Sequence, residues 1–331
     1  MSEKRQTPDQ TDRVADAVNK NWVDLYAPTR FRPYLRLSRA DRPAGTWLLL
    51  IPCIWSLCLA SLSIDIGFST NIKYVILMSI GAFLMRGAGC TWNDITDLKI
   101  DASVKRTKSR PIPSGQITVK QALNWMLIQT LAGAVILFSF DKFTISLGLI
   151  ALIPVAIYPF AKRFTWWPQL FLGIAFNWGA LIGWSSLMGS LSLSPILLYL
   201  SGISWTLFYD TIYAHQDKED DALIGVKSTA RLFQSNTKKW LWFFLIISII
   251  FMTLAFTTAL KSENNIFCFI IGITGILAFG IHLIWQLINL DINNADNCLM
   301  IFRSNRNAGL LPVLGFTCAI ILQSIILTSY S

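Results

Sequence analysis

The sequence predicts an all-α protein whose helices cross a membrane many times. Hydrophobic residues make up 53% of its 331 residues and charged residues only 14%, well below the roughly one quarter typical of soluble domains. The mean hydropathy is +0.51. Apolar stretches of about 20 residues, the length that a helix needs to cross the hydrocarbon core, recur along the chain, and strand-like alternation is absent. A polytopic helical bundle is therefore favoured over a soluble domain or an outer-membrane barrel.

Nine such stretches can be placed, with ends defined to within several residues. They cover 44–62, 73–92, 120–138, 143–161, 168–188, 193–213, 240–260, 265–288 and 308–327. Residues 1–30 are polar and mix acids with bases, and they are predicted to form a flexible tail ahead of a transmembrane domain over 31–331. Asn177 lies in the middle of the fifth span, where an interhelical hydrogen bond is its expected role.

The basic residues predict the orientation of the bundle. Of the 28 Lys and Arg residues, 24 lie in segment 1–42 or in connections on one side, three lie on the other side, and Arg86 lies within the second span. This asymmetry places the amino terminus and the polar loops in the cytoplasm of a bacterium, with the chain in the inner (cytoplasmic) membrane. The acids near the amino terminus argue against a transit peptide and so against the alternative, the mitochondrial inner membrane. The net charge of +9 reflects this bias and requires no nucleic-acid partner, and no protein partner is predicted.

Two acidic clusters stand where the second and sixth spans end. In "TWNDITDLKID" (91–101), Asn93, Asp97 and Asp101 are spaced at i, i+4 and i+8, and so share one side of a continuing helix. In "YDTIYAHQDKEDD" (209–221), a second stripe at i, i+3, i+7 and i+11 consists of Asp210, Tyr213, Asp217 and Asp221. Both clusters are predicted on the same side of the membrane.

Converging carboxylates repel one another unless a cation lies between them. Mg²⁺ is the natural candidate, because it takes hard oxygen ligands from one or two carboxylates together with substrate phosphates. The clusters are therefore predicted to hold a diphosphate through bridging Mg²⁺. The alternative is that these residues cap helix ends or lie on a solvated surface.

The same residues carry a resemblance to a known family. "NDITDLKID" with "VKRTKSRPIPSG" (104–115), and "YDTIYAHQDKEDD" with "IGVKSTA" (224–230), resemble the UbiA superfamily of intramembrane prenyltransferases. Together with "RADRPAGTWLLL" (39–50) and "YPFAKR" (158–163), they are most similar to its 4-hydroxybenzoate polyprenyltransferases of ubiquinone biosynthesis. The resemblance implies nine helices around a central cavity, under a cytoplasmic cap formed by the loops after helices 2 and 6. It implies the metal ligands Asn93, Asp94, Asp97, Asp101, Asp217 and Asp221, with Asp210 and Tyr213 close to the substrates.

The implied reaction transfers a polyprenyl group from polyprenyl diphosphate to the ring carbon of 4-hydroxybenzoate ortho to the hydroxyl, releasing diphosphate. Asp97, Asp217 and Asp221 would be catalytic through Mg²⁺, which neutralises the leaving group. Lys105, Arg106 and Arg110 are candidate diphosphate clamps or, equally, ordinary basic loop residues. Lys162 and Arg163 end a span, where they could serve as membrane anchors alone. The resemblance implies that they are candidate substrate-binding residues.

Arg86 lies seven residues before Asn93, and so about 10 Å deeper along the same helix. An unpaired arginine there is costly. It is predicted either to pair with an aspartate of the motif or to hold a substrate anion, namely the carboxylate of the aromatic acid or the diphosphate. In the second role it belongs to the catalytic residues.

Two other functions compete with this one. Related prenyltransferases act on other rings, such as naphthoate, homogentisate or haem, and keep the same aspartates. A cation-coupled transporter would also place charges in a membrane, but it needs them near the midplane, whereas these clusters lie at helix ends. The sequence does not specify the length of the prenyl chain.

Overall fold

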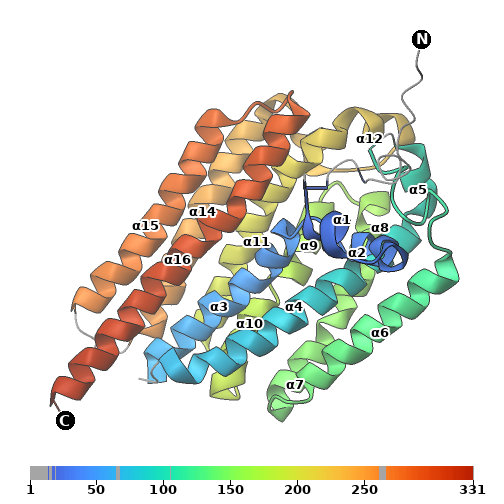
Figure 1. Cartoon of the computed structure of the whole chain (residues 1–331). Helices are drawn as coiled ribbons and strands as arrows, with labels where there is room; N and C mark the ends of the chain where they lie inside the picture. The colour runs from blue at the N-terminus through green and yellow to red at the C-terminus, as the bar shows by residue number, and fades with distance from the viewer. Residues whose placement is uncertain are drawn as a thin grey trace.

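A computed structural model describes residues 14, 17, 18, 20–64, 68–104, 106–260 and 266–330, which form a bundle of long helices (Figure 1). The described residues contain no β-strand. The long elements are α3 (Ala44–Ile64), α4 (Phe68–Thr96), α6 (Val119–Leu137), α7 (Lys142–Ile150), α8 (Leu152–Phe164), α9 (Pro168–Phe176), α10 (Gly179–Met188), α11 (Leu193–Ala214), α14 (Thr237–Ala259), α15 (Ile266–Asn289) and α16 (Ala295–Tyr330).

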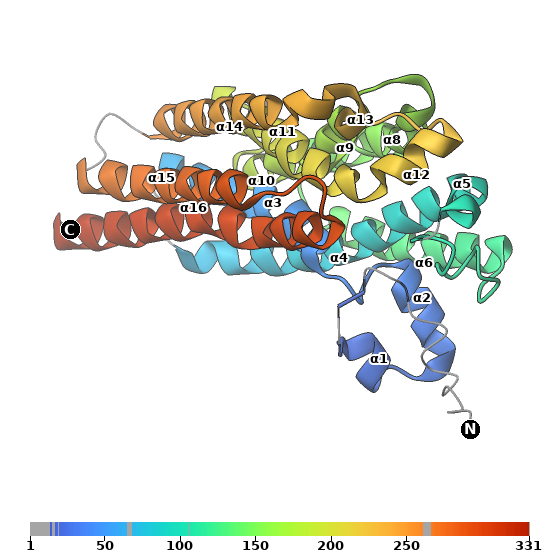
Figure 2. The same ribbon diagram turned by 90° about the horizontal axis from the view of Figure 1, so that it is seen from above.

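The short helices gather toward the end of the bundle opposite the carboxyl terminus (Figures 1 and 2). They are α1 (Trp22–Tyr26), α2 (Arg32–Leu37), α5 (Leu98–Ser103), α12 (Lys218–Ile224) and α13 (Thr229–Phe233), with single 3-10 turns at Thr29–Phe31, His215–Asp217 and Gln234–Asn236. Helix α2 packs against α4 and α6. We call this end of the bundle, where the acidic clusters also lie, the charged end.

Each of the nine predicted spans coincides with a long helix or a pair of helices, and two of them are broken. The stretch 143–161 forms α7 and α8, and Pro154 lies in the first turn of α8, where its missing N–H removes no helical hydrogen bond. The stretch 168–188 forms α9 and α10, which meet at Asn177. The Asn177 side chain donates to the Gly173 carbonyl and, over 2.8 Å, to Thr206 Oγ1 of α11, which confirms the expected interhelical hydrogen bond.

Seven helical segments within the described residues are long and apolar enough to cross a membrane. They comprise α3, α4, the pairs α7–α8 and α9–α10, α14 with the preceding α13, α15 and α16. Helices α6 and α11 lie in the same bundle but carry more polar side chains. The structure thus confirms a polytopic helical bundle, whereas the count of nine spans stays a prediction.

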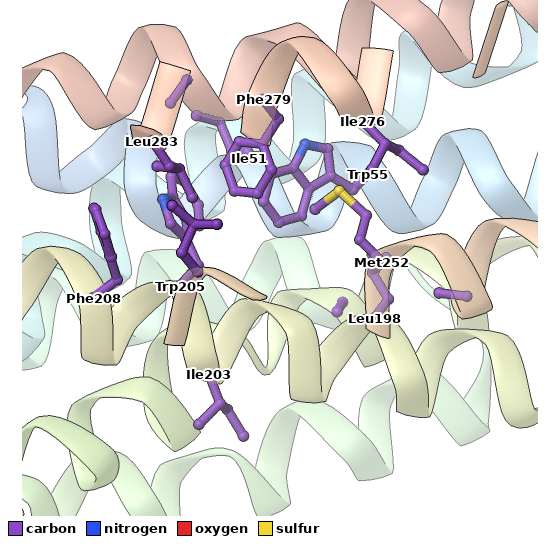
Figure 3. Packing of buried hydrophobic residues seen from close by; sticks show 14 of the residues in the cluster. Ile51, Trp55, Leu198, Ile203, Trp205, Phe208, Met252, Ile276, Phe279 and Leu283 are labelled. Carbon is purple, nitrogen blue, oxygen red and sulfur yellow. The ribbon is translucent and has the colours of Figure 1, made fainter. Parts of the chain in front are cut away.

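The main core lies where α3, α11, α14, α15 and α16 meet, and Figure 3 shows buried side chains of α3, α11, α14 and α15 in it. Trp55 and Trp205 pack with ring centroids 5.0 Å apart, and Phe279 contacts both rings. Their indole N–H groups donate to Gly309 O and Asn305 Oδ1 of α16, because a buried indole requires an acceptor. These bonds fix α16 against α3 and α11.

Helix α16 is the longest element, with 36 residues. At 1.5 Å per residue it extends about 54 Å, well beyond the roughly 30 Å thickness of a hydrocarbon core. Leu299, Phe302 and Arg303, in its first three turns, line a cavity at the charged end. One helix therefore contributes both to the apolar core and to the wall of that cavity.

Replacing Gly275 by Ala is expected to lower the free energy of unfolding by about 1–3 kcal/mol, as overpacking does. A methyl group at Gly275 would lie 2.9 Å from Gly315 Cα and 3.1 Å from the Leu311 carbonyl oxygen, and backbone atoms cannot move aside as a side-chain tip can. The thermal unfolding midpoint in detergent measures the effect. Gly81→Ala is the control, because a methyl group there meets nothing within 4 Å. An unchanged midpoint for Gly275→Ala would contradict the close packing of α15 on α16.

Candidate functional site

A cavity of about 280 Å³ opens at the charged end, between the last turns of α4, α8 and α11 and the loops that follow them. We call it the charged cavity. Its ionic and amide side chains include Arg39, Arg42, Arg86, Asn93, Asp101, Arg106, Arg110, Lys162, Asp210, Asp217, Asp221, Lys227 and Arg303. The two acidic clusters, more than 100 residues apart in the chain, therefore both contribute side chains to one space.

The first cluster divides into two pairs. Asn93 and Asp101 line the charged cavity, whereas Asp94 and Asp97 are fully buried behind its wall. Helix α4 ends at Thr96, and α5 begins at Leu98. The spacing of the cluster predicted one continuous helix, and helical hydrogen bonds do run through the junction, from Asp97 N–H to Asn93 O and from Asp101 N–H to Asp97 O. The Asp97 carboxylate is nevertheless buried against Lys162 and does not line the cavity with the other two.

Each carboxylate of the first cluster is paired with a cation. Asp94 Oδ1 accepts from Arg39 Nη2 at 2.5 Å and from Arg110 Nη1 at 3.2 Å, and Asp101 accepts from Arg110 at 2.7 Å. Asp97 accepts from the Lys162 ammonium. These pairs balance charges that would be costly to bury alone.

All four residues of the second cluster, Asp210, Tyr213, Asp217 and Asp221, line the charged cavity. They do not share one helix, as their spacing predicted, because α11 ends at Ala214 and Asp221 lies on α12 after a 3-10 turn. Arg106, from the loop after α5, reaches across and donates from Nε to Asp217 Oδ1 over 2.7 Å and from Nη1 to the Tyr213 hydroxyl over 3.0 Å. The loop that follows the first cluster is thus tied to the second.

Burial and the neighbouring Asp217 carboxylate raise the pKa of Asp221 to about 7. Burial likewise raises the pKa of Asp101, with Asp94 adding to the effect and Arg110 opposing it. Carboxylates with raised pKa values lie where a further cation would be favourable.

The side chains suit a divalent cation by their chemistry. Within the described ranges, no three acidic, His or Cys side chains lie close enough together to hold a metal ion. Asp94 nevertheless has one buried oxygen, Oδ2, that accepts no hydrogen bond from the described part of the chain. The donor set of one amide and five carboxylates is the hard oxygen set that Mg²⁺ prefers, so these residues fit the metal by their chemistry.

The structure places the other predicted residues unequally. Arg106, Arg110 and Lys162 line the charged cavity, but Arg163 does not: its side chain is 45% exposed and donates to the Thr96 carbonyl oxygen at 2.5 Å. Lys105 lies outside the described residues. The substrate roles of Arg163 and Lys105 stay predictions.

Arg39 and Arg42 also line the charged cavity. Both belong to the stretch "RADRPAGTWLLL", but neither was predicted as a site residue. They flank Asp41 just before α3, and Arg39 adopts a left-handed backbone, with φ 60°. Burial raises the pKa of Asp41 to about 6, although Arg39 opposes the shift. Two arginines beside an aspartate in "RADRPAG" were a usable signal, but it was attributed to the general excess of basic residues on that side.

A second cavity, of about 240 Å³, lies deeper in the bundle, between α3, α4, α6, α7–α8 and α9–α10. We call it the apolar cavity, because aliphatic and aromatic side chains make up nearly all of its wall. Arg86, Tyr158 and Phe176 line both cavities. These three residues therefore mark the junction between the charged and apolar spaces.

Arg86 stands at this junction beside an aromatic ring. Its guanidinium carbon lies 5.1 Å from the centroid of the Phe176 ring, and its buried Nε donates no hydrogen bond to any residue that the structure describes. In the part of the chain that the structure describes, Arg86 makes no ion pair; Asp210 is the carboxylate that its charge stabilises across the cavity. This geometry argues against the ion pair with a motif aspartate and favours an arginine that is available to a substrate anion.

Comparison with known proteins places the chain in a family. The sequence model of the UbiA prenyltransferase family matches residues 49–306. Proteins named "4-hydroxybenzoate polyprenyltransferase, mitochondrial" align over most of the chain. That of Arabidopsis thaliana is 45% identical over 92% of this chain and 72% of its own length, and that of Bos taurus is 47% identical over 87% and 76%. The Dictyostelium discoideum protein is 46% identical over 92% of this chain, which spans 64% of that relative's length.

Solved structures support the fold. A UbiA homologue from Aeropyrum pernix superposes with a TM-score of 0.66 at 20% identity, covering 83% of this chain and 97% of that one. A homologue from Archaeoglobus fulgidus, described as bound to GPP and Mg²⁺, superposes with a TM-score of 0.62 at 17% identity over 87% and 99%.

The relatives also correct one prediction. The bacterial inner membrane is the wrong location, because these relatives are eukaryotic proteins named as mitochondrial. The acids near the amino terminus, which argued against a mitochondrial protein, were a weak guide. The assignment of the charged end to a bacterial cytoplasm falls with that location. The helical fold, the two acidic motifs and these matches agree, and the chain belongs to the UbiA prenyltransferase family.

Proposed function

We propose that this chain transfers a polyprenyl group from polyprenyl diphosphate to the ring carbon of 4-hydroxybenzoate ortho to the hydroxyl, releasing diphosphate, in ubiquinone biosynthesis. The observation that carries the proposal is the junction of the charged cavity with the apolar cavity. A polyprenyl diphosphate has an anionic diphosphate head and a long hydrocarbon chain. The charged cavity suits the head, and the apolar cavity suits the chain. The names of the relatives support the aromatic acceptor. The proposal includes the mitochondrial inner membrane as the location, with the charged end facing the matrix, since the excess of Lys and Arg marks the side that is not translocated.

The residues that would hold Mg²⁺ are Asn93, Asp94, Asp97, Asp101, Asp217 and Asp221. When bound, the ion would neutralise the negative charge that develops on the leaving diphosphate. The Archaeoglobus homologue, which is described as binding GPP together with Mg²⁺, supports a divalent metal.

The basic side chains of the charged cavity provide the second half of this stabilisation. Arg106, Arg110 and Lys162 now donate to carboxylates. A diphosphate offers the same donors a stronger acceptor at the same place, and fixed cations that face the developing charge lower the barrier to its departure. The groups that keep the acidic clusters neutral in the free protein thus become the clamp for the substrate.

The junction would protect the reactive carbon. The prenyl carbon that loses diphosphate lies, in this arrangement, between the charged cavity and the apolar cavity, beside the rings of Tyr158 and Phe176. Aromatic faces stabilise a cation, and an apolar space excludes the water that would otherwise capture it. The acceptor ring then meets the cation from the Arg86 side: the ring carbon forms the new C–C bond and loses its proton, which the released diphosphate can accept.

Asp217→Asn is expected to lower kcat/KM on the order of 100-fold or more, because several kcal/mol of electrostatic stabilisation depend on the metal that this carboxylate would hold. Removal of Mg²⁺ with a chelator should abolish transfer, and added Mg²⁺ should restore it. Asp296→Asn is the matched control: this exposed aspartate lies at the same end of the bundle, in the first turn of α16. Full activity in the chelator, or in Asp217→Asn, would contradict the proposed role of the metal.

Arg86→Leu is expected to remove the preference for an acceptor with a carboxylate. A charge-assisted hydrogen bond contributes about 1.5–3 kcal/mol, so the ratio of kcat/KM for 4-hydroxybenzoate over phenol should fall roughly 10- to 100-fold. Labelled polyprenyl diphosphate and purified membranes provide the assay. Arg306→Leu, an exposed arginine of α16 that bonds only Asn307 within the described chain, is the control.

An equal loss with both acceptors would mean that Arg86 holds diphosphate instead. If the native protein prenylates neither acceptor, another aromatic acceptor must be sought, and the narrower part of the proposal fails.

A further inference from the structure

We propose that Gly45 is the positioning residue of Arg86: its missing side chain leaves the space that the guanidinium occupies, and so fixes the guanidinium at the junction of the two cavities. The inference rests on the proposed function and names a residue that sets how the acceptor is recognised. Gly45 lies in the first turn of α3, is buried, and lines the charged cavity together with Arg86.

The space is too small for a side chain. A Cβ built on Gly45 would lie 2.6 Å from both Nε and Nη2 of Arg86 and 2.8 Å from its Cζ, whereas favourable carbon contacts occur near 3.5–4.0 Å. All three atoms belong to the guanidinium. The backbone of Gly45 therefore forms the surface against which the charged group of Arg86 rests.

Contacts with two residues hold Arg86 in this place. The guanidinium lies between the backbone of Gly45 and the ring of Phe176, whose centroid is 5.1 Å from Cζ. Within the described residues it makes no ion pair, and its buried Nε donates no hydrogen bond. Because no short ion pair or hydrogen bond among these residues fixes the group, a methyl group on one side would displace it.

The displaced atoms are the end of a flexible side chain, so the fold would tolerate the change. Alanine also favours a helix more than glycine does, and Gly45 is helical. Gly45→Ala is therefore a change that moves the charge of Arg86 without removing it and without a loss of stability.

The anion that this guanidinium receives is the carboxylate of the acceptor. Arg42, Arg106, Arg110 and Lys162 already surround the acidic clusters of the charged cavity, which is where the diphosphate would bind. Arg86 lies about 10 Å deeper along α4 than Asn93, at the border of the apolar cavity, and it is the cation that both cavities share.

Gly45→Ala should raise the KM for 4-hydroxybenzoate at least tenfold and change the KM for polyprenyl diphosphate less than twofold, with an unfolding midpoint no lower than that of the native protein. Gly280→Ala is the matched control. Its added methyl group would lie 2.7 Å from the tip of Ile249, a comparable clash with a side-chain end, remote from both cavities. The control should leave both KM values as in the native enzyme.

The double variant Gly45→Ala/Arg86→Leu tests whether Gly45 acts through Arg86 or affects the acceptor site in another way. If Gly45 acts through Arg86, adding Gly45→Ala to Arg86→Leu should change the KM for 4-hydroxybenzoate by less than twofold, because the group that it displaces is gone. A full tenfold effect in that background, or native KM values in Gly45→Ala alone, would overturn the proposal. If Gly45→Ala raises the KM for polyprenyl diphosphate instead of the KM for 4-hydroxybenzoate, Arg86 does not hold the carboxylate of the acceptor, and that part of the proposal is overturned.

A binding readout keeps this inference distinct from the proposed function. Saturating 4-hydroxybenzoate should raise the unfolding midpoint of the native protein, phenol should not, and Gly45→Ala should lose the rise. If the native protein shows the rise but does not prenylate the acid, the proposed function fails and the role of Gly45 stands. If Gly45→Ala keeps the full rise, the role of Gly45 is overturned.

Discussion

Charge balance in a space with little water is the constraint on which the functional end of this protein depends. Asp94 and Asp97 have no exposed surface, and an ionised carboxylate is very costly to bury alone. Three separate parts of the chain supply the balancing cations: Arg39 before α3, Arg110 after α5 and Lys162 at the end of α8. These pairs fasten the segment before α3, the loop after α4 and the end of α8 to one another, and so they shape the cavity as well as neutralise it.

The same balance lets the site exchange partners. Breaking a buried pair by removing one member is costly, whereas an exchange of one partner for another of the same sign leaves the remaining charge compensated. A metal ion can take the place of a guanidinium at a carboxylate, and a phosphate can take the place of that carboxylate at the guanidinium. The total charge within the cavity then stays compensated throughout substrate binding, so the proposed chemistry needs no carboxylate to be left alone in an apolar medium.

The parts of the site that the sequence predicted depend on local geometry. The spacing of Asp210, Tyr213, Asp217 and Asp221 predicted that they share one side, and all four line the charged cavity, although the chain passes from α11 through a 3-10 turn into α12 between them. Asp97 does not line it, because its carboxylate is buried against Lys162 of α8, a partner 65 residues away that no local pattern indicates. The partner of Arg39 could not be assigned from its neighbours, since Asp94 lies 55 residues away. The breaks in α7–α8 and α9–α10 were likewise hidden inside uniformly apolar stretches, and they help to shape the wall of a cavity that no periodicity indicated.

The length of α16 has a consequence for the way in which the surrounding lipid acts on the enzyme. Its lower turns belong to the apolar core through Asn305, Gly309 and the two buried tryptophans, and its upper turns form part of the cavity wall through Phe302 and Arg303. A helix longer than the hydrocarbon core accommodates hydrophobic mismatch by tilting or kinking, and Pro312 lies inside α16 beyond these anchored turns. A thinner or thicker bilayer would therefore act on the part of α16 after Pro312, while the bonds from Trp55 and Trp205 hold its first turns, and with them this part of the cavity wall, against α3 and α11.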